Sequence, residues 1–258
     1  MDFTQRLEWI EQVMNAEQTE HLQPPAENRI LGMQGSTESQ LQLPLKHISL
    51  FRPEHYEPGY AYPLVIWLHP DGGSEHDLHH IMPQVSLRNY LGLSFRAPAI
   101  DPAAPENGYH WPDSHLFAAQ FVESIQKTVQ ELRKVLNIHA DRIYLAGTGN
   151  GCSMATKLLL KAPHFFAGAA LLNGSFSVKD FQKTSGASLK ANRVLLDRRS
   201  TDHSDSKLSA QWLSRMWETT GADIQTVNSL KTETTHDSEL FHILDRWIME
   251  GISTAWLV

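Results

Sequence analysis

The residues of this sequence that could carry out chemistry gather first in a glycine-rich turn at residues 147–151, Gly-Thr-Gly-Asn-Gly. The apolar stretch IYLAG leads into the turn, and the helical pattern CSMATKLLL follows it. A strand–turn–helix unit of this kind has two common uses. It can bind a phosphate group at the helix N-terminus, or it can present a nucleophilic serine at the middle of the pattern G-x-S-x-G.

The glycine spacing favours the second use. The phosphate-binding pattern G-x-G-x-x-G requires a small residue at its sixth position, where Cys152 stands. In G-x-S-x-G the flanking glycines let the helix approach the strand with almost no clearance, and Gly147 and Gly151 meet that need. The middle residue, however, is Gly149, which has no side chain and cannot form an acyl-enzyme. We expect Gly149 to end a central parallel strand with a positive φ, which glycine adopts at little cost.

Other residues near the turn are weaker candidates. Cys152 and Ser153 could replace the missing nucleophile, but we expect both inside the following helix, facing the sheet or neighbouring helices. In the segment SEHDLHH, His76 and His80 share one helical face, yet the pattern specifies no third metal ligand. We therefore predict a solvated helix start there, no metal site and no cofactor.

Strands and helices alternate around these candidates. Short apolar runs predict strands at 64–70, 93–100, 142–147, 166–174, 191–199 and 222–230, and 45–53 alternates like an edge strand. Helical spacing predicts helices at 3–14, at 115–136, from 150, at 207–219 and from about 237. This alternation is typical of an α/β fold with a mostly parallel central sheet and helices on both faces.

Composition limits the possible partners and location. The formal net charge of −7 argues against nucleic acid or an anionic membrane as the main partner. No apolar run is long enough to span a membrane, and the acidic N-terminal segment is unlike a signal peptide. With a single cysteine, the chain is expected to be a cytoplasmic protein. We predict an N-terminal helix and arm at 1–44 and one domain at 45–258; the oligomeric state stays open.

Five segments carry a resemblance to a known family. They are YPLVIWLHPDGGSE, NGYHWPD, DRIYLAGTGNGCSMATKLLLKAPHFFAGAALLNG, RVLLDRRSTD and HDSELFHILDRWI, in this order. Together the chain resembles an α/β hydrolase of the phospholipase/carboxylesterase type, a group of small esterases and acyl-thioesterases. The resemblance covers residues from about 45 to the C-terminus and implies the α/β-hydrolase fold.

The resemblance also implies positions for a catalytic triad. Gly149 takes the nucleophile position, Asp202 the acid and His236 the histidine, which is the order expected of this fold. Asp205 remains an alternative acid, and Asp237 or Glu239 could engage the histidine instead.

The resemblance further implies the surroundings of the triad. Asp71 and Asn150 take the positions of the oxyanion hole, where backbone N–H groups face developing negative charge. His69, Gly72 and Trp111 fall at the substrate cleft, where we expect Trp111 to pack beneath the cleft rather than to bind ligand.

Two departures from the family pattern affect function. Serine is replaced by Gly149, and the oxyanion loop carries Pro70 and Asp71 where the pattern has glycine and a small or apolar residue. A carboxylate beside an oxyanion would oppose its stabilisation. Because both sites depart, we expect natural loss of the serine machinery rather than an engineered knock-out.

Three functions stay open. The leading hypothesis is a carboxylesterase-like protein with a degenerate nucleophile turn, acting as a pseudoenzyme or as a binder of a small acyl ester or related molecule. The second is an ester hydrolase in which His236 and Asp202 activate water directly. The third is a protein-interaction module.

Overall fold

The computed structural model describes residues 47–100, 108–174, 181, 189–197, 210–227 and 238–254. The helix predicted at 3–14 and the rest of the segment 1–44 lie outside these ranges. So do Asp202, Asp205, His236 and Asp237. The division of the chain at residue 45 therefore stays a prediction.

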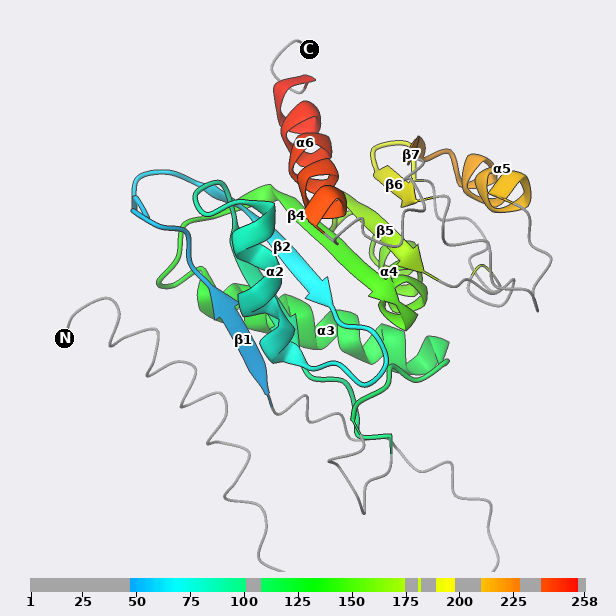
Figure 1. The fold of residues 1–258 in the computed structure, drawn as a ribbon, viewed down its shortest axis with the longest axis horizontal. Coiled ribbons are helices and arrows are strands. Elements are labelled where there is room, and N and C mark those ends of the chain that lie inside the picture. The colour runs from blue at the N-terminus through cyan, green and yellow to red at the C-terminus, as the bar shows by residue number, and fades with distance from the viewer. Residues whose placement is uncertain are drawn as a thin grey trace, which may run out of the picture.

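In the described part of the chain, seven strands form one sheet in the order β1-β3-β2-β4-β5-β6-β7 (Figure 1). The strands are β1 Ile48–Phe51, β2 Tyr62–Leu68, β3 Leu91–Phe95, β4 Ile138–Gly149, β5 Gly168–Gly174, β6 Arg193–Asp197 and β7 Asp223–Val227. β1 runs antiparallel to β3 at the edge, and every other neighbouring pair is parallel. All seven residues of β2 are buried, as the continuous apolar run of a strand covered on both faces requires.

Helices cover both faces of the sheet. They are the 3₁₀ helix η1 Glu75–Asp77 and the α-helices α2 Leu78–Val85, α3 His115–Leu132, α4 Asn150–Lys161, α5 Ala210–Thr220 and α6 Ser238–Thr254. The apolar sides of α2 and α6 share one core with one face of the sheet, and those of α3 and α4 share a second core with the other face (Figure 1). This architecture confirms the predicted mostly parallel α/β fold. Among the described helices, none is both long enough and apolar enough to cross a membrane.

One predicted strand is longer than the observed one. The strand predicted at 93–100 ends at Phe95, and beyond it Ala99 makes only an isolated bridge to Tyr109. Pro98 lies between them and has no N–H to donate to a sheet ladder.

The strand order reverses between β2 and β4. From β2 the chain continues to β3 on one side, whereas β4 lies on the other side of β2. In open α/β sheets, ligands bind outside the carboxyl ends of the strands at such a point. The loop after Leu68 and the turn at Gly149 meet there, and these are the two segments that the sequence singles out.

Candidate active site

Gly149 forms a sharp turn between β4 and α4. It is the last residue of the strand and the N-cap of the helix, with φ 53° and ψ −127°. A residue with a side chain is strained at such a positive φ, by about 1–3 kcal/mol. The prediction that Gly149 ends a central parallel strand with positive φ is confirmed.

The glycines on either side hold α4 close to the strands. A Cβ added to Gly151 would lie 2.2 Å from the carbonyl oxygen of Leu68. A Cβ added to Gly147 would lie 2.8 Å from the carbonyl carbon of Gly151. No real side chain fits at such distances, so both positions require glycine for close approach, as the turn pattern predicts.

Pro70 lies against the space that a side chain at Gly149 would occupy. A Cβ built on Gly149 would lie 3.2 Å from Pro70 Cβ and 3.7 Å from Pro70 Cα. The first distance is shorter than an ordinary van der Waals contact between carbons, which is about 3.5–4.0 Å. A side chain at residue 149 therefore needs either a shift of the loop after β2 or a smaller residue at position 70.

His69 anchors that loop from below. Its ring is fully buried, Nδ1 donates to the carbonyl oxygen of Pro70 at 2.8 Å, and Nε2 accepts from the N–H of Ala97 at 3.1 Å. Burial lowers the pKa of His69, although its hydrogen bond to Pro70 and nearby carboxylates act in the opposite direction. With both nitrogens engaged, the neutral ring fixes the loop.

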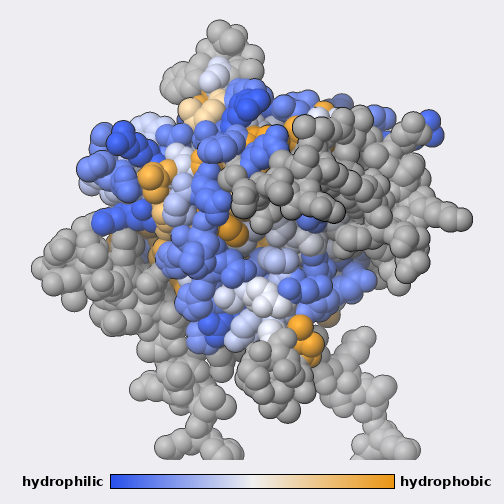
Figure 2. Space-filling model, in the orientation of Figure 1, coloured by the Kyte–Doolittle hydropathy of each residue, from blue (hydrophilic) through white to orange (hydrophobic). Residues whose placement is uncertain are grey.

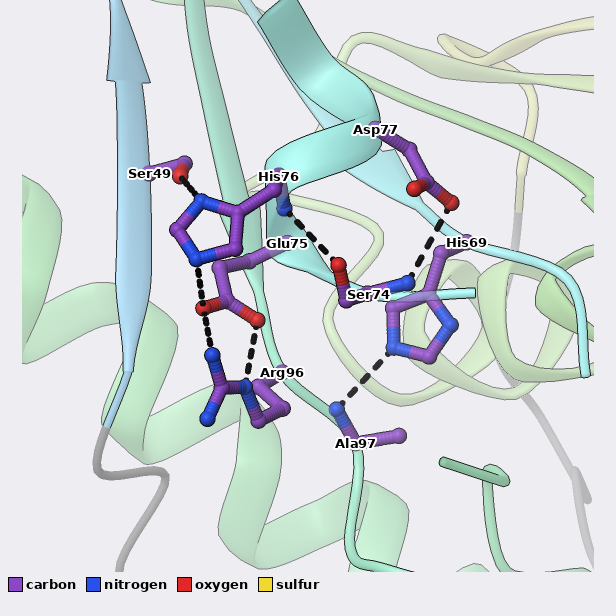
Figure 3. A network of polar contacts seen from close by, with 8 residues as sticks. All are labelled: Ser49, His69, Ser74, Glu75, His76, Asp77, Arg96 and Ala97. Carbon is purple, nitrogen blue, oxygen red and sulfur yellow. Dashed lines mark hydrogen bonds and ion pairs between the residues drawn. The ribbon is translucent and has the colours of Figure 1, made fainter. Parts of the chain in front are cut away.

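A buried ion pair holds the far end of the same loop (Figure 3). The carboxylate of Glu75, which is 1% exposed, accepts from Arg96 Nε at 2.6 Å and from Arg96 Nη2. His76 Nε2 lies 3.1 Å from Glu75 Oε1, and its Nδ1 lies 3.4 Å from Ser49 Oγ. These contacts tie the start of η1 to β1 and to the chain after β3.

The segment before α3 packs against the loop. The buried indole of Trp111 donates to the carbonyl oxygen of His69 at 2.9 Å and stacks on Phe121, with the ring centroids 5.1 Å apart. The N–H of Gly72 donates to the carbonyl oxygen of Tyr109 at 2.9 Å. Trp111 thus packs beneath the loop at the carboxyl end of β2, in agreement with the packing expected from the sequence. Ligand contacts by His69, Gly72 and Trp111 stay predictions.

Asp71, His110 and Asn150 come together from three segments at the exposed side of the turn. His110 Nδ1 lies 2.7 Å from Asp71 Oδ1, and the two side chains are 46% and 54% exposed. Asn150 Nδ2 donates to the carbonyl oxygen of Trp111 at 2.9 Å and lies 3.3 Å from His110 Nδ1. His110 is not among the residues predicted from the sequence, where its one available signal was its place directly before Trp111 in NGYHWPD.

The two alternative nucleophiles are poorly placed for chemistry. Cys152 is fully buried, and burial raises the pKa of its thiol well above the usual range, which disfavours the reactive thiolate. Ser153 accepts from Lys157 Nζ at 2.6 Å, while the same ammonium lies 3.0 Å from Asp113 Oδ1. An ammonium group has no lone pair with which to activate the serine. These contacts pin α4 to the segment before α3.

The elements next to the other two triad positions also lie toward the carboxyl end of the sheet. β6 ends at the buried Asp197, five residues before Asp202 by number, and α6 begins at Ser238, two residues after His236. The N-terminal end of α6 is turned toward the carboxyl ends of the strands (Figure 1). Glu239 lies in the first turn of α6 and is exposed. No group of three or more potential metal ligands occurs among the described residues.

Comparison with known proteins identifies the fold of this chain. Neither the protein-family models nor the curated proteins include a match to the sequence. Solved structures do match. A carboxylesterase of Bacillus cereus is similar with a TM-score of 0.61 and 16% identity, over 80% of this chain and 94% of that one.

Two further structures give the same picture. A carboxylesterase from Mesorhizobium loti has a TM-score of 0.58 and 16% identity, over 72% of this chain and 88% of that one. A phospholipase/carboxylesterase from Dyadobacter fermentans has a TM-score of 0.55 and 15% identity, over 78% and 95%. The protein therefore has the α/β-hydrolase fold, in the form shared with carboxylesterase and phospholipase/carboxylesterase structures.

Proposed function

We propose that this protein is a carboxylesterase-like member of the α/β-hydrolase fold that has lost serine-dependent acyl transfer and binds a small acyl ester or a related molecule at the Gly149 turn. One observation carries the proposal. The backbone at Gly149 has the strained turn that presents a nucleophile in G-x-S-x-G, but the residue has no side chain, and Pro70 stands against the space above it.

The Pro70 contact supports natural loss. The family pattern has serine at the turn and glycine in the loop, whereas this chain has Gly149 and Pro70. At 3.2 Å, an added Cβ at residue 149 and the Cβ of Pro70 do not both fit without a shift. Once the turn carried glycine, the loop position was free to accept a larger residue.

Asp71 supports the loss independently. An oxyanion hole lowers the barrier to acyl transfer because its dipoles face developing negative charge. Here an exposed carboxylate stands in the same loop and lies within hydrogen-bonding distance of His110. Its charge disfavours an anionic tetrahedral intermediate at this place.

The proposal includes no cofactor and no nucleic-acid partner, and it includes a cytoplasmic location. The described part of the face in Figure 2 is mainly hydrophilic, with small, separated hydrophobic areas. This pattern gives little support to an apolar protein-docking surface on that face.

Activity assays test the proposal. The purified protein should not hydrolyse p-nitrophenyl butyrate above background, because removal of a triad nucleophile costs on the order of 10⁶ in kcat. A fluorophosphonate probe should leave every serine unlabelled. Stoichiometric labelling of a serine would make the protein an active serine hydrolase and end the proposal.

The same assay separates the other functions. Turnover without fluorophosphonate labelling, lost in His236→Ala and Asp202→Asn, would support water activation by that pair. Absence of both turnover and saturable binding of short acyl esters would favour the interaction module.

A further inference from the structure

We propose that Asp71, His110 and Asn150 form a binding site for a protonated amine, so that the small molecule bound at the Gly149 turn carries an ammonium group. The inference rests on the proposed ligand-binding function and adds the chemical class of the ligand. It begins from the hydrogen bonds within the cluster.

The first step assigns the hydrogen on His110 Nδ1. That nitrogen lies 2.7 Å from Asp71 Oδ1 and 3.3 Å from Asn150 Nδ2. A carboxylate only accepts hydrogen bonds, so a lone pair on Nδ1 facing it at 2.7 Å would be repulsive. The hydrogen therefore sits on Nδ1 and is donated to Asp71, so Nδ1 has no lone pair left and its 3.3 Å approach to Asn150 Nδ2 is a contact without a hydrogen bond.

Three side-chain atoms of the cluster remain able to bind a ligand. With the hydrogen on Nδ1, the uncharged form of the His110 ring offers a lone pair at Nε2. Asp71 keeps its second oxygen, and Asn150 keeps its side-chain carbonyl oxygen because its nitrogen donates to Trp111. In the described part of the chain none of these three atoms has a hydrogen-bond partner. All three are acceptors.

The dipole of α4 acts against the binding of a cation at this place. The N-terminus of α4 at Asn150 carries about half a positive charge, which favours anions. The Asp71 carboxylate carries a full negative charge on the same side of the turn. The backbone N–H of Gly72, a possible further donor, already donates to the carbonyl oxygen of Tyr109 at 2.9 Å. The backbone N–H groups of Asp71 and Asn150, at the expected oxyanion-hole positions, can still donate, but the Asp71 carboxylate brings a full negative charge. That charge and the three side-chain acceptors therefore favour a ligand that donates hydrogen bonds and carries positive charge.

Position supports the same conclusion. The cluster lies at the carboxyl ends of β2 and β4, where the strand order reverses and α/β sheets bind their ligands. Esterases use donors at this place to hold an oxyanion. Acceptors at the same place reverse the preference for ligand charge.

A matched series of probes tests the inference. Hexylammonium, 1-hexanol and hexanoate share one alkyl chain and differ in the charge of the head group. Each is titrated into ¹⁵N-labelled protein at about pH 8, where an alkylamine is charged and an alkanoate is ionised. The reporters are the side-chain amide of Asn150 and the backbone amide of Gly72. Hexylammonium should shift these resonances with the lowest Kd, and hexanoate should have the highest.

Asp71→Asn keeps the shape of the side chain and removes its charge. Because an exposed ion pair contributes modestly, this change should raise the Kd of hexylammonium about threefold to fivefold and leave that of 1-hexanol unchanged. Asp141→Asn removes the same charge from an exposed site elsewhere and serves as the control.

The inference is overturned if hexanoate binds as tightly as hexylammonium at these resonances, if none of the three probes shifts them, or if Asp71→Asn behaves like Asp141→Asn. These outcomes leave the loss of serine chemistry untouched. Turnover of p-nitrophenyl butyrate with fluorophosphonate labelling would instead overturn the proposed function, whatever the order of the three affinities.

Discussion

The turn after β4 and the loop after β2 differ from the esterase sequence pattern in different ways. At the turn, the backbone keeps the strained conformation and the close glycine contacts, and only the side chain at Gly149 is missing. In the loop, the supports below remain, with a buried His69 and the Glu75–Arg96 ion pair. The half-buried Pro70 and the exposed Asp71 are the residues that differ from the family pattern.

The buried residues that support the turn and the loop, among them Gly147, Gly151, His69 and the Glu75–Arg96 pair, form a frame that is distinct from the reacting groups. This frame stabilises the folded protein, because changes to it leave buried polar groups without partners or create clashes. The exposed Asp71 contributes little to stability, because surface substitutions usually change it by less than about 0.5 kcal/mol. A serine at residue 149 should therefore be accepted on this buried support, whereas damage to the support should cost stability.

Repair of the site has the largest expected effect. Gly149→Ser alone should hydrolyse p-nitrophenyl butyrate weakly, because Pro70 crowds the new side chain and Asp71 opposes the oxyanion. Adding Pro70→Gly and Asp71→Ala should raise kcat by about 10²–10³, the usual worth of an oxyanion donor. Ester hydrolysis is measured for the single, double and triple variants.

His236→Ala in the triple variant is the control for this repair. It should abolish the restored activity, because the histidine is the expected base. A folded but inactive triple variant, or activity that survives the loss of His236, would show that the triad positions are wrongly assigned.

Removal of the buried charge from the loop support comes next in magnitude. Glu75→Gln leaves the Arg96 guanidinium with a neutral partner, and breaking a buried ion pair costs about 3–5 kcal/mol. Because Arg96 is 22% exposed, we expect a loss near the lower end of that range. Urea unfolding measures the change, with Glu123→Gln on the exposed side of α3 as the control. Equal free energies of unfolding for the two variants would show that Glu75 does not stabilise the support of this loop.

A side chain at the turn should cost less. Gly149→Ala should lower the free energy of unfolding by about 1–3 kcal/mol, because alanine is strained at φ 53°. Gly59→Ala, whose added Cβ meets nothing within 4 Å, should change it by less than about 0.5 kcal/mol.

A double-mutant cycle with Pro70→Gly sharpens this test. If the 3.2 Å contact contributes to the cost, Gly149→Ala should be less destabilising in the Pro70→Gly background than in the wild type. Additive effects would mean that Pro70 and residue 149 do not compete for space.

Acid pH should produce the smallest effect. Burial would raise the pKa of Glu75, but its hydrogen bonds to Arg96 and the charge of Arg96 outweigh burial and hold the pKa below its ordinary value. The unfolded chain therefore binds this proton first, and the stabilisation is present above about pH 4.3 and lost as the pH falls further. Unfolding free energies from about pH 6 to about pH 3 should decline less steeply in Glu75→Gln than in the wild type. Parallel pH profiles would argue against this linkage.

The sequence by itself determined the layers of the fold and the location of the turn. A short continuous apolar run such as residues 64–68 is typical of a strand buried on both faces, and helical spacing such as that of Phe117 and Phe121 identifies the buried side of α3. Gly147, Gly149 and Gly151 revealed the turn because close approach and positive φ depend on the local residue type. These properties are local, so a linear pattern records them.

Only the tertiary structure decided which side chains meet at the turn. The family resemblance placed Asp71 and Asn150 at one site, but only the structure brings His110, from a third segment, into contact with both side chains. The contact between Pro70 and the space above Gly149 depends likewise on how closely the loop after β2 approaches the end of β4. Long-range proximity is set by the packing of the whole sheet and its helices, so the place of His110 directly before Trp111 did not by itself reveal this contact.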